Sequence, residues 1–334
     1  MPFTAETCVA MHLGDRKEQQ DRVALFGHPK RPGMMMAVLA DGMGGHSGGA
    51  MAAEQVLMRA RQNFEAYAPL HETPEHLLRS IIDEAHVVIK LTRFTSEQDP
   101  HSTAVVFMMQ QGKAYWAHCG DSRMYHFRGT RTMSVSGDHS LVAELVRKGR
   151  LDDRAALRHP QRNVLLSCLG SDREPRIDYG REESPLAGDC FLLCSDGLWA
   201  HFTEFELAST LQEFPARAAA ERLVALGRER AGGTGDNISL AVVKLIEART
   251  DPPPPPAPPS RAETTTPSLA GAPTQTTAHP GPPVGAAAAA NAAFRQSTRV
   301  RAPPPLSRLP ALLHKPPRVP ARAGAARRWC AKLD

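Results

Sequence analysis

Four aspartates stand beside apolar segments that are typical of buried β-strands. They are Asp41 after Met34–Ala40, Asp121 after Tyr115–Cys119, Asp196 after Phe191–Cys194, and Asp236 before Ile238–Leu245. Carboxylates at the tips of core strands can converge at one edge of a sheet sandwich, where several negative charges persist only if cations neutralise them. Oxygen ligands of this kind favour Mg²⁺ or Mn²⁺ over zinc or copper. The set therefore indicates a site for a hard divalent cation.

A structural alternative applies to each of these aspartates taken alone. Asp-Gly and Asp-Asn are ordinary turn-forming dipeptides, and turns are expected where strands end. For Asp121 in particular, a purely structural role in its turn stays open. Only the recurrence of the pattern at four strand ends favours the metal site.

The hydrophobic pattern predicts the elements that must position these side chains. Strand-like runs are Cys8–Leu13, Val23–Phe26, Met34–Ala40, Thr103–Gln110, Lys113–Cys119, Arg123–Arg128, Thr132–Ser136, Cys190–Cys194 and Ile238–Leu245. Segments with helical spacing are Gly49–Tyr67, Thr73–Phe94, Leu141–Lys148, Glu204–Gln212 and Ala216–Ala231. Gln111-Gly112 and Gly129-Thr130 are typical hairpin connections, so the middle of the chain is predicted to be an antiparallel meander without βαβ units. The predicted fold class is α+β, with mainly antiparallel sheets flanked by helices.

The composition of the chain changes near residue 248. Residues 249–334 hold 19 of the 29 prolines and 12 Lys or Arg against 3 Asp or Glu, which leaves 28 basic and 32 acidic residues in the first 248. The net charge of +5 therefore describes the tail, and no specific nucleic-acid binding is expected of the mildly acidic remainder. Because a tail of this composition cannot bury enough apolar area, we predict a disordered region over 249–334 after one folded domain over 1–248.

The cysteines and the first residues indicate the compartment. Cys8, Cys119, Cys168, Cys190, Cys194 and Cys330 lack the spacing of a disulfide framework or a zinc site, which fits reduced thiols. Met1–Arg16 has neither a basic start nor an apolar core, and the longest apolar run, Met34–Ala40, is too short to span a bilayer. We therefore expect a cytoplasmic protein.

Seven short motifs occur in an order that resembles one known family. They are Gly14-Asp15-Arg16-Lys17-Glu18-Gln19-Gln20-Asp21, Asp41-Gly42-Met43-Gly44-Gly45-His46, Ser102-Thr103-Ala104, Gly120-Asp121-Ser122-Arg123, Asp138-His139-Ser140, Cys194-Ser195-Asp196-Gly197-Leu198-Trp199 and Gly235-Asp236-Asn237. Each motif is weak alone, but the series resembles the metal-dependent protein serine/threonine phosphatases (PPM, or type 2C) in their compact bacterial form. The resemblance covers about residues 4–246. It implies an α-β-β-α sandwich with a dinuclear metal site at one edge, which hydrolyses phosphoserine and phosphothreonine.

The resemblance also implies which residues hold the two Mn²⁺ or Mg²⁺ ions. In this family one carboxylate and one water bridge the ions; by position that carboxylate is Asp41, and the Gly42 carbonyl also contributes. Asp196 and Asp236 would complete the second ion, and Asp21 would hold metal-bound water. Such a two-metal site activates the bridging water for in-line attack on phosphorus, so no phosphoenzyme is needed.

Two further residues match family positions. By its position in the first motif, Arg16 matches the family's phosphate-binding arginine. A guanidinium suits this role because its planar fork can bind two phosphate oxygens at once and stays charged at every relevant pH. The alternative is a surface arginine in a charged loop. Asp121 matches the carboxylate of a third and weaker metal ion.

Three residues depart from the family pattern. Gln19 replaces an asparagine, Gln20 takes a position that is Glu or Gln, and Met43 stands where human-type members carry a histidine as candidate general acid. General acid catalysis usually contributes about 10²–10⁴-fold. These departures leave open the alternative of a catalytically weak phosphoprotein-binding pseudophosphatase. The retention of all four strand-end aspartates favours the enzyme.

The expected partners follow from the same resemblance. They are phosphorylated Ser/Thr proteins, including a cognate bacterial kinase, and no feature demands an oligomer, so a monomer is expected. Residues Gly149–Gly170 correspond to the family's variable flap, which either recognises residues around the phosphate or is a solvated, mobile charged face. The basic, Pro-rich tail either docks an acidic or Pro-recognising partner or is a linker without a specific partner.

Deleting residues 250–334 should leave the turnover of a small phosphate ester unchanged, because every residue of the expected site lies before the tail. Steady-state kinetics of the full chain and the truncated protein would test this. A large loss of activity would place the domain boundary elsewhere.

Overall fold

The computed structural model describes residues 3–45, 47–93, 98–156 and 158–248, and every structural statement below concerns these residues. The predicted tail over 249–334 lies outside them, as does Phe94 at the end of the second predicted helix. Within the described ranges, no helix combines the length and the apolar character needed to cross a membrane.

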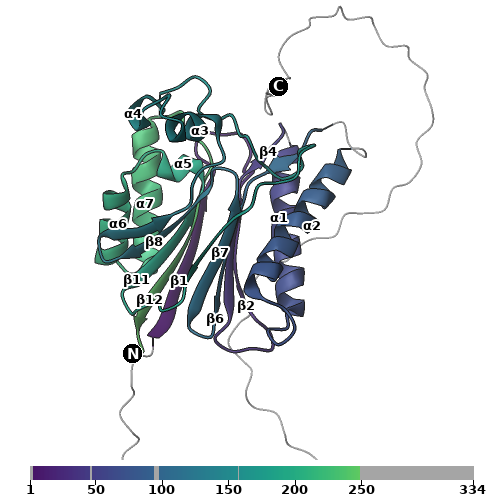
Figure 1. Cartoon of the computed structure of the whole chain (residues 1–334). Helices are drawn as coiled ribbons and strands as arrows, with labels where there is room; N and C mark the ends of the chain where they lie inside the picture. Colours follow the sequence, from purple (N-terminus) through teal and green to yellow (C-terminus); the bar gives the residue numbers. More distant parts are fainter. Residues whose placement is uncertain (1–2, 46, 94–97, 157, 249–334) are drawn as a thin grey trace, which may run out of the picture. The chain divides into compact units, whose positions relative to one another are not determined.

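Two five-stranded antiparallel sheets lie face to face (Figure 1). The β12 sheet has the order β1 (Phe3–His12), β12 (Ile238–Glu247), β11 (Asp189–Cys194), β8 (Arg123–Arg128) and β9 (Arg131–Val135). The β3 sheet has the order β10 (Asp178–Glu182), β7 (Lys113–Cys119), β6 (Ala104–Gln110), β3 (Met35–Ala40) and β2 (Arg22–Gly27). A two-stranded ladder joins β4 (Gly42–Met43) to β5 (His101–Ser102).

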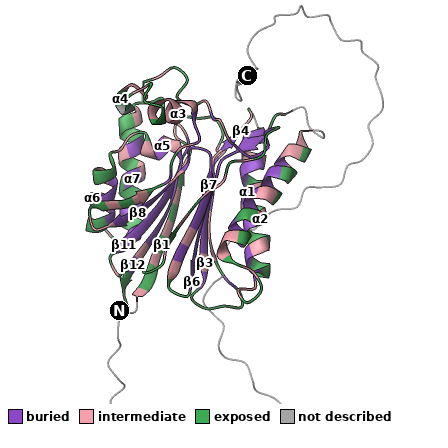
Figure 2. Cartoon of the chain, viewed as in Figure 1, coloured by how far each residue is buried: buried purple, intermediate pink, exposed green. Residues whose placement is uncertain are grey.

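Helices cover the outer face of each sheet (Figures 1 and 2). The pair α1 (Ser47–Ala66) and α2 (Pro74–Thr92) packs on the β3 sheet, and the pair α6 (Glu204–Glu213) and α7 (Ala216–Ala231) packs on the β12 sheet. Three short helices, α3 (Leu141–Arg147), α4 (Asp153–Ala156) and α5 (Asp196–Trp199), lie in connecting segments. The predicted α-β-β-α sandwich is confirmed.

Strand β12 shows why the central strands are apolar at nearly every position. Its residues Leu240 and Val242 belong to the hydrophobic cluster beneath α6 and α7. The alternating Ala241 and Val243 belong to a different cluster, between the two sheets. A strand covered on both faces must be apolar on both, so its sequence is continuous rather than alternating.

The predicted strands and helices all occur, but the continuous meander is wrong. The hairpins β6–β7 and β8–β9 form as expected, yet β7 pairs with β10 and β8 pairs with β11, so the chain changes sheets after Cys119. Gly120 makes this crossing with a φ of +110°, and a Cβ there would lie 2.6 Å from Thr103 Cγ2. The crossing places the next residue, Asp121, between the two sheets.

Sequence patterns missed the edge strand β10. Its sequence is mostly charged or polar, and its glycine lowers strand propensity. Gly180 is required by its cross-strand neighbour, because a Cβ there would lie 2.2 Å from the Trp116 ring. The short elements β4, β5, α4 and α5 were also missed.

A close backbone contact fixes the start of α1 against the strand end that carries Asp41. A Cβ on Gly49 would lie 2.7 Å from the carbonyl carbon and oxygen of Gly42, and a Cβ on Gly42 would lie 2.0 Å from the Gly49 oxygen. Only glycine at both positions permits this approach.

Gly49→Ala should therefore destabilise the protein by about 1–3 kcal/mol, because the new methyl group forces the two segments apart. Helix propensity alone predicts the opposite sign, since alanine is a better helix former than glycine. Chemical denaturation would measure the change. Gly27→Ala is the matched control, because no atom lies within 4 Å of the added Cβ; it should change stability by less than about 0.5 kcal/mol.

Candidate active site

Five aspartates converge where strands of both sheets end. Asp21 precedes β2 and Asp41 follows β3, whereas Asp196 follows β11 and Asp236 precedes β12. Asp121 stands on the crossing from β7 to β8. Burial raises the pKa of Asp41 well above its ordinary value, and the charges of the four other aspartates raise it further. The structure thus brings together all five predicted carboxylates.

Asp41 is held by the turn that precedes β6. Its backbone N–H donates to Thr103 Oγ1 at 2.9 Å, and the Thr103 N–H donates back to the Asp41 carbonyl at 2.9 Å. The Thr103 hydroxyl also lies 2.8 Å from Ser122 Oγ, next to Asp121. Two of the sequence motifs therefore serve as the frame that orients Asp41.

Asp21 is the most enclosed of the five aspartates, with 1% of its surface exposed. Ser195 Oγ donates to its Oδ2 at 2.8 Å and accepts from the Ser239 N–H at 3.1 Å. Burial, followed by the charges of Asp196 and Asp236, raises the pKa of Asp21 to about 7 although the Ser195 bond opposes the shift. Ser195 is a site residue to which the sequence assigned no role.

Asp196 begins the single turn of α5. Burial and the charge of Asp236 raise its pKa to about 6, against the charges of Arg16 and Arg162. Arg162 belongs to the segment matched to the family's flap, so this segment lies beside the acidic cluster.

Arg16 reaches the cluster from its solvent side. Its Nη2 lies 2.5 Å from Asp236 Oδ2, and 58% of the arginine side chain is exposed. An exposed guanidinium has further N–H donors in its fork that can receive an oxyanion. The structure therefore brings the predicted phosphate-binding residue to the predicted metal ligands.

Asn237 ties the segment that carries Arg16 to the start of β12. Its Nδ2 donates to the carbonyls of Leu13 at 2.8 Å and Glu18 at 3.1 Å, and its Oδ1 accepts from the Gln20 N–H at 2.8 Å. Asn237 is 4% exposed. In the sequence, Asn237 has only a motif position; the available signal is a polar residue directly before an apolar strand.

The departures from the family pattern have definite places. Gln19 Oε1 is buried without a hydrogen-bond partner among the described residues. Met43 lies in β4 opposite His101, whose Nε2 is 3.3 Å from Asp99. Met43 carries no proton to donate, so the position that is histidine in human-type members has no acid role here.

The donor set fits a hard divalent cation. It consists of carboxylate oxygens, together with the buried Gly42 whose carbonyl the resemblance adds. Burial and mutual repulsion raise the pKa of Asp21, Asp41, Asp121 and Asp196, and bound cations would remove that repulsion. These residues fit Mg²⁺ or Mn²⁺ better than any softer metal.

A second cluster, formed by His118, His139 and Asp178, has its potential ligand atoms within 4.8 Å of one another. His139 Nδ1 accepts from the Gly120 N–H at 3.2 Å, so its other nitrogen carries the proton and faces Asp178 Oδ2 at 3.1 Å. The imidazoles stack at 4.8 Å, and Arg176 also binds Asp178. In this arrangement the cluster supports the Gly120 crossing.

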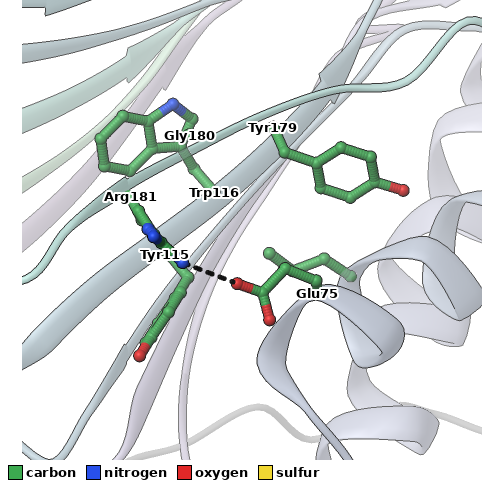
Figure 3. A pocket seen from close by; sticks show the side chains of 7 residues that line it. Glu75, Tyr115, Trp116, Tyr179, Gly180 and Arg181 are labelled. Carbon is green, nitrogen blue, oxygen red and sulfur yellow. Dashed lines mark ion pairs between the residues drawn. The ribbon is translucent and has the colours of Figure 1, made fainter.

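One surface cavity of about 270 Å³ lies between α2 and the strands β7 and β10 (Figure 3). Tyr115 and Tyr179 line it, and an ion pair of 4.0 Å joins Glu75 to Arg181 across it. None of the five aspartates lines this cavity. It is therefore separate from the candidate active site.

Comparisons with known proteins agree with this geometry. A family model described as protein phosphatase 2C matches residues 8–228. Protein phosphatase PhpP of Streptococcus pneumoniae serotype 2 is 31% identical over 235 residues, which cover 70% of this chain and 94% of the relative. The serine/threonine phosphatase stp of Listeria monocytogenes serovar 1/2a is also 31% identical over 235 residues, which cover 69% of this chain and 91% of that relative.

Solved structures share the fold. The serine/threonine phosphatase of S. agalactiae aligns with a TM-score of 0.66 and 28% identity over 73% of this chain and all of its own. The catalytic domain of the phosphatase PstP, solved with 2 manganese ions, aligns with a TM-score of 0.62 and 23% identity over 74% of this chain and all of its own.

The raised pKa values predict how metal and pH act together on stability. Asp21 and Asp196 have folded-state pKa values of about 7 and about 6, above the value of about 3.9 for an unfolded aspartate. Their ionisation therefore removes stability from the metal-free protein as the pH rises from about 4 through 7. A cation that binds the ionised cluster reverses this loss.

Mn²⁺ at about 1 mM should therefore raise the Tm above its value in chelator, and this increase should be several degrees larger at pH 8 than at pH 5. Taking the difference at each pH cancels the titration of groups that the metal does not touch. An equal Mn²⁺ effect at the two pH values would contradict the assignment.

Proposed function

The chain belongs to the protein phosphatase 2C family and is a serine/threonine protein phosphatase, and we propose that its five converging aspartates hold the catalytic divalent metal ions while Arg16 binds the phosphoryl group. The observation that supports this most directly is the convergence of five aspartates at the ends of strands from both sheets, with the exposed Arg16 guanidinium against one of them. The family is metal dependent; we propose two Mn²⁺ or Mg²⁺ ions, with a third at Asp121.

Asp41, the Gly42 carbonyl, Asp196 and Asp236 would hold the two ions, and Asp21 would hold metal-bound water. The chemistry that bound metal supplies here is neutralisation of the carboxylates and activation of a water nucleophile. Ser195 holds the Asp21 carboxylate through its 2.8 Å hydrogen bond, so Asp21 presents a fixed oxygen to the cluster.

Arg16 positions the substrate phosphate for in-line displacement. Asp236 contacts the guanidinium at Nη2, which orients the fork. The remaining donors bind two phosphoryl oxygens and hold the phosphorus over the cluster. Since Met43 has no proton, the departing serine or threonine oxygen takes its proton from another donor.

The substrates and partners follow from this chemistry. We propose phosphoserine and phosphothreonine proteins as substrates, among them a cognate kinase, and a monomeric protein acting in the cytoplasm. Arg162 lies near Asp196, which supports a role of the flap segment in recognising residues around the phosphate. Docking of an acidic or Pro-recognising partner on the tail is part of the same proposal.

Hydrolysis of a phosphothreonine peptide should require Mn²⁺ or Mg²⁺ and cease with chelator. Asp196→Asn should lower kcat by at least about 100-fold, because it removes several kcal/mol of charge stabilisation. Asp83→Asn is the matched control: the same chemical change on the surface of α2, where Asp83 pairs only with Arg79, should leave kcat unchanged.

Chelator-resistant turnover would contradict the proposed mechanism. A folded protein that binds Mn²⁺ and phosphopeptide without turnover would instead support the pseudophosphatase alternative. Gln19, Gln20 and Met43 would then be the residues to revert.

A further inference from the structure

The Trp199 indole joins two of the segments that carry aspartates. Trp199 is the last residue of α5, the turn that Asp196 begins. Its Nε1 donates to the Asp121 carbonyl at 2.9 Å. One side chain therefore connects the β11–α5 end to the crossing between the two sheets.

An anchored arginine supports the indole from one face. The Arg123 guanidinium carbon lies 3.6 Å from the centre of the Trp199 ring. Arg123 Nε and Nη2 each donate to Asp138 at 2.8 Å, and Nη1 donates to the Tyr125 hydroxyl at 3.1 Å. With both ends of its fork occupied, Arg123 is a rigid platform, and the cation–π contact is desolvated.

This network lies where it can resist the electrostatic repulsion between two carboxylates. Asp121 and Asp196 are two of the converging aspartates, and the Trp199 hydrogen bond joins the Asp121 backbone to the turn that Asp196 begins. These two carboxylates therefore repel each other, and a flexible connection would let their segments separate. The Trp199 hydrogen bond spans the same two segments.

We propose that Trp199 is a positioning residue that sets the separation of Asp121 and Asp196 and thereby the affinity of the protein for the cation that Asp121 helps to hold. The inference rests on the assignment of Asp121 as a metal ligand in the proposed function. Trp199 itself touches neither substrate nor metal; it acts through the Asp121 backbone.

Trp116 offers a matched comparison within the same domain. Both tryptophans are at least half buried, but Trp116 packs against Gly180 and Phe191 among apolar residues of the two sheets. Its ring contacts are apolar side chains and the Gly180 backbone, whereas the Trp199 indole donates to the Asp121 carbonyl. A Trp→Phe change at either position removes one indole N–H and one ring of the side chain. Only Trp199→Phe also removes the hydrogen bond to the Asp121 carbonyl.

The test is a Mn²⁺ titration of the full chain, followed by electron paramagnetic resonance, for the wild type, Trp199→Phe and Trp116→Phe. Trp199→Phe should weaken the weakest Mn²⁺ site by about 5–10-fold, the value of one buried hydrogen bond, and leave the tighter sites within about twofold. Trp116→Phe should match the wild type at every site. Equal weakening of all sites, or no weakening, by Trp199→Phe would overturn the proposal.

Asp121→Asn separates this inference from the function on which it rests. If the wild type binds no Mn²⁺, the proposed function fails. If Asp121→Asn weakens one site and Trp199→Phe does not, only the role of Trp199 fails. The double variant should bind Mn²⁺ as Asp121→Asn does, because both changes act on one site, whereas a general structural role would add a further loss.

Should Trp199→Phe fail to fold, Asp138→Asn provides the second variant. It weakens the support of Arg123 without altering the tryptophan, and it should lower the affinity of the same weakest site. Unchanged Mn²⁺ binding by a folded Asp138→Asn protein would then overturn the proposal.

Discussion

Repulsion among buried carboxylates is the constraint that organises this structure. Five aspartates that converge at one edge of the sandwich repel one another when ionised. Burial and this repulsion raise the pKa of Asp21, Asp41, Asp121 and Asp196, and Asp236 forms an ion pair with Arg16. A scaffold that tolerates such a cluster must be rigid, since any loose segment would move its charge away from the others. The two sheets and their four covering helices supply that rigidity.

Neutral contacts supply much of this rigidity. Backbone bonds to Thr103 hold Asp41, a serine hydroxyl holds Asp21, and the Asn237 amide holds the segment before β2. The close approach of Gly42 and Gly49 adds contact without side chains. Because these groups are uncharged, they fix the carboxylates without neutralising them, which leaves the negative potential available to cations.

The sequence was sufficient to predict the strands, the long helices and the convergence of the aspartates, but not the residues that support these aspartates. Hydrophobic pattern located the strands and long helices because burial on one or both faces leaves a local periodicity, and Asp41 or Asp196 could be found by their place at strand ends. The roles of Ser195 and Asn237 depend on partners 174 and 219 residues away, which no local pattern contains. Strand β10 and the change of sheet after Cys119 also depend on tertiary pairing, since a hairpin signal specifies its two strands and not the sheet that they join.

The crossing at Gly120 divides the acidic cluster between the halves of the molecule. Asp21 and Asp41 belong to the β3 sheet, Asp196 and Asp236 to the β12 sheet, and Asp121 to the connection itself. Neither half holds all five aspartates, so the proposed metal site exists only in the assembled sandwich. Such a protein cannot shrink to a functional half-domain by deletion, and any metal that binds at the seam fastens one half to the other.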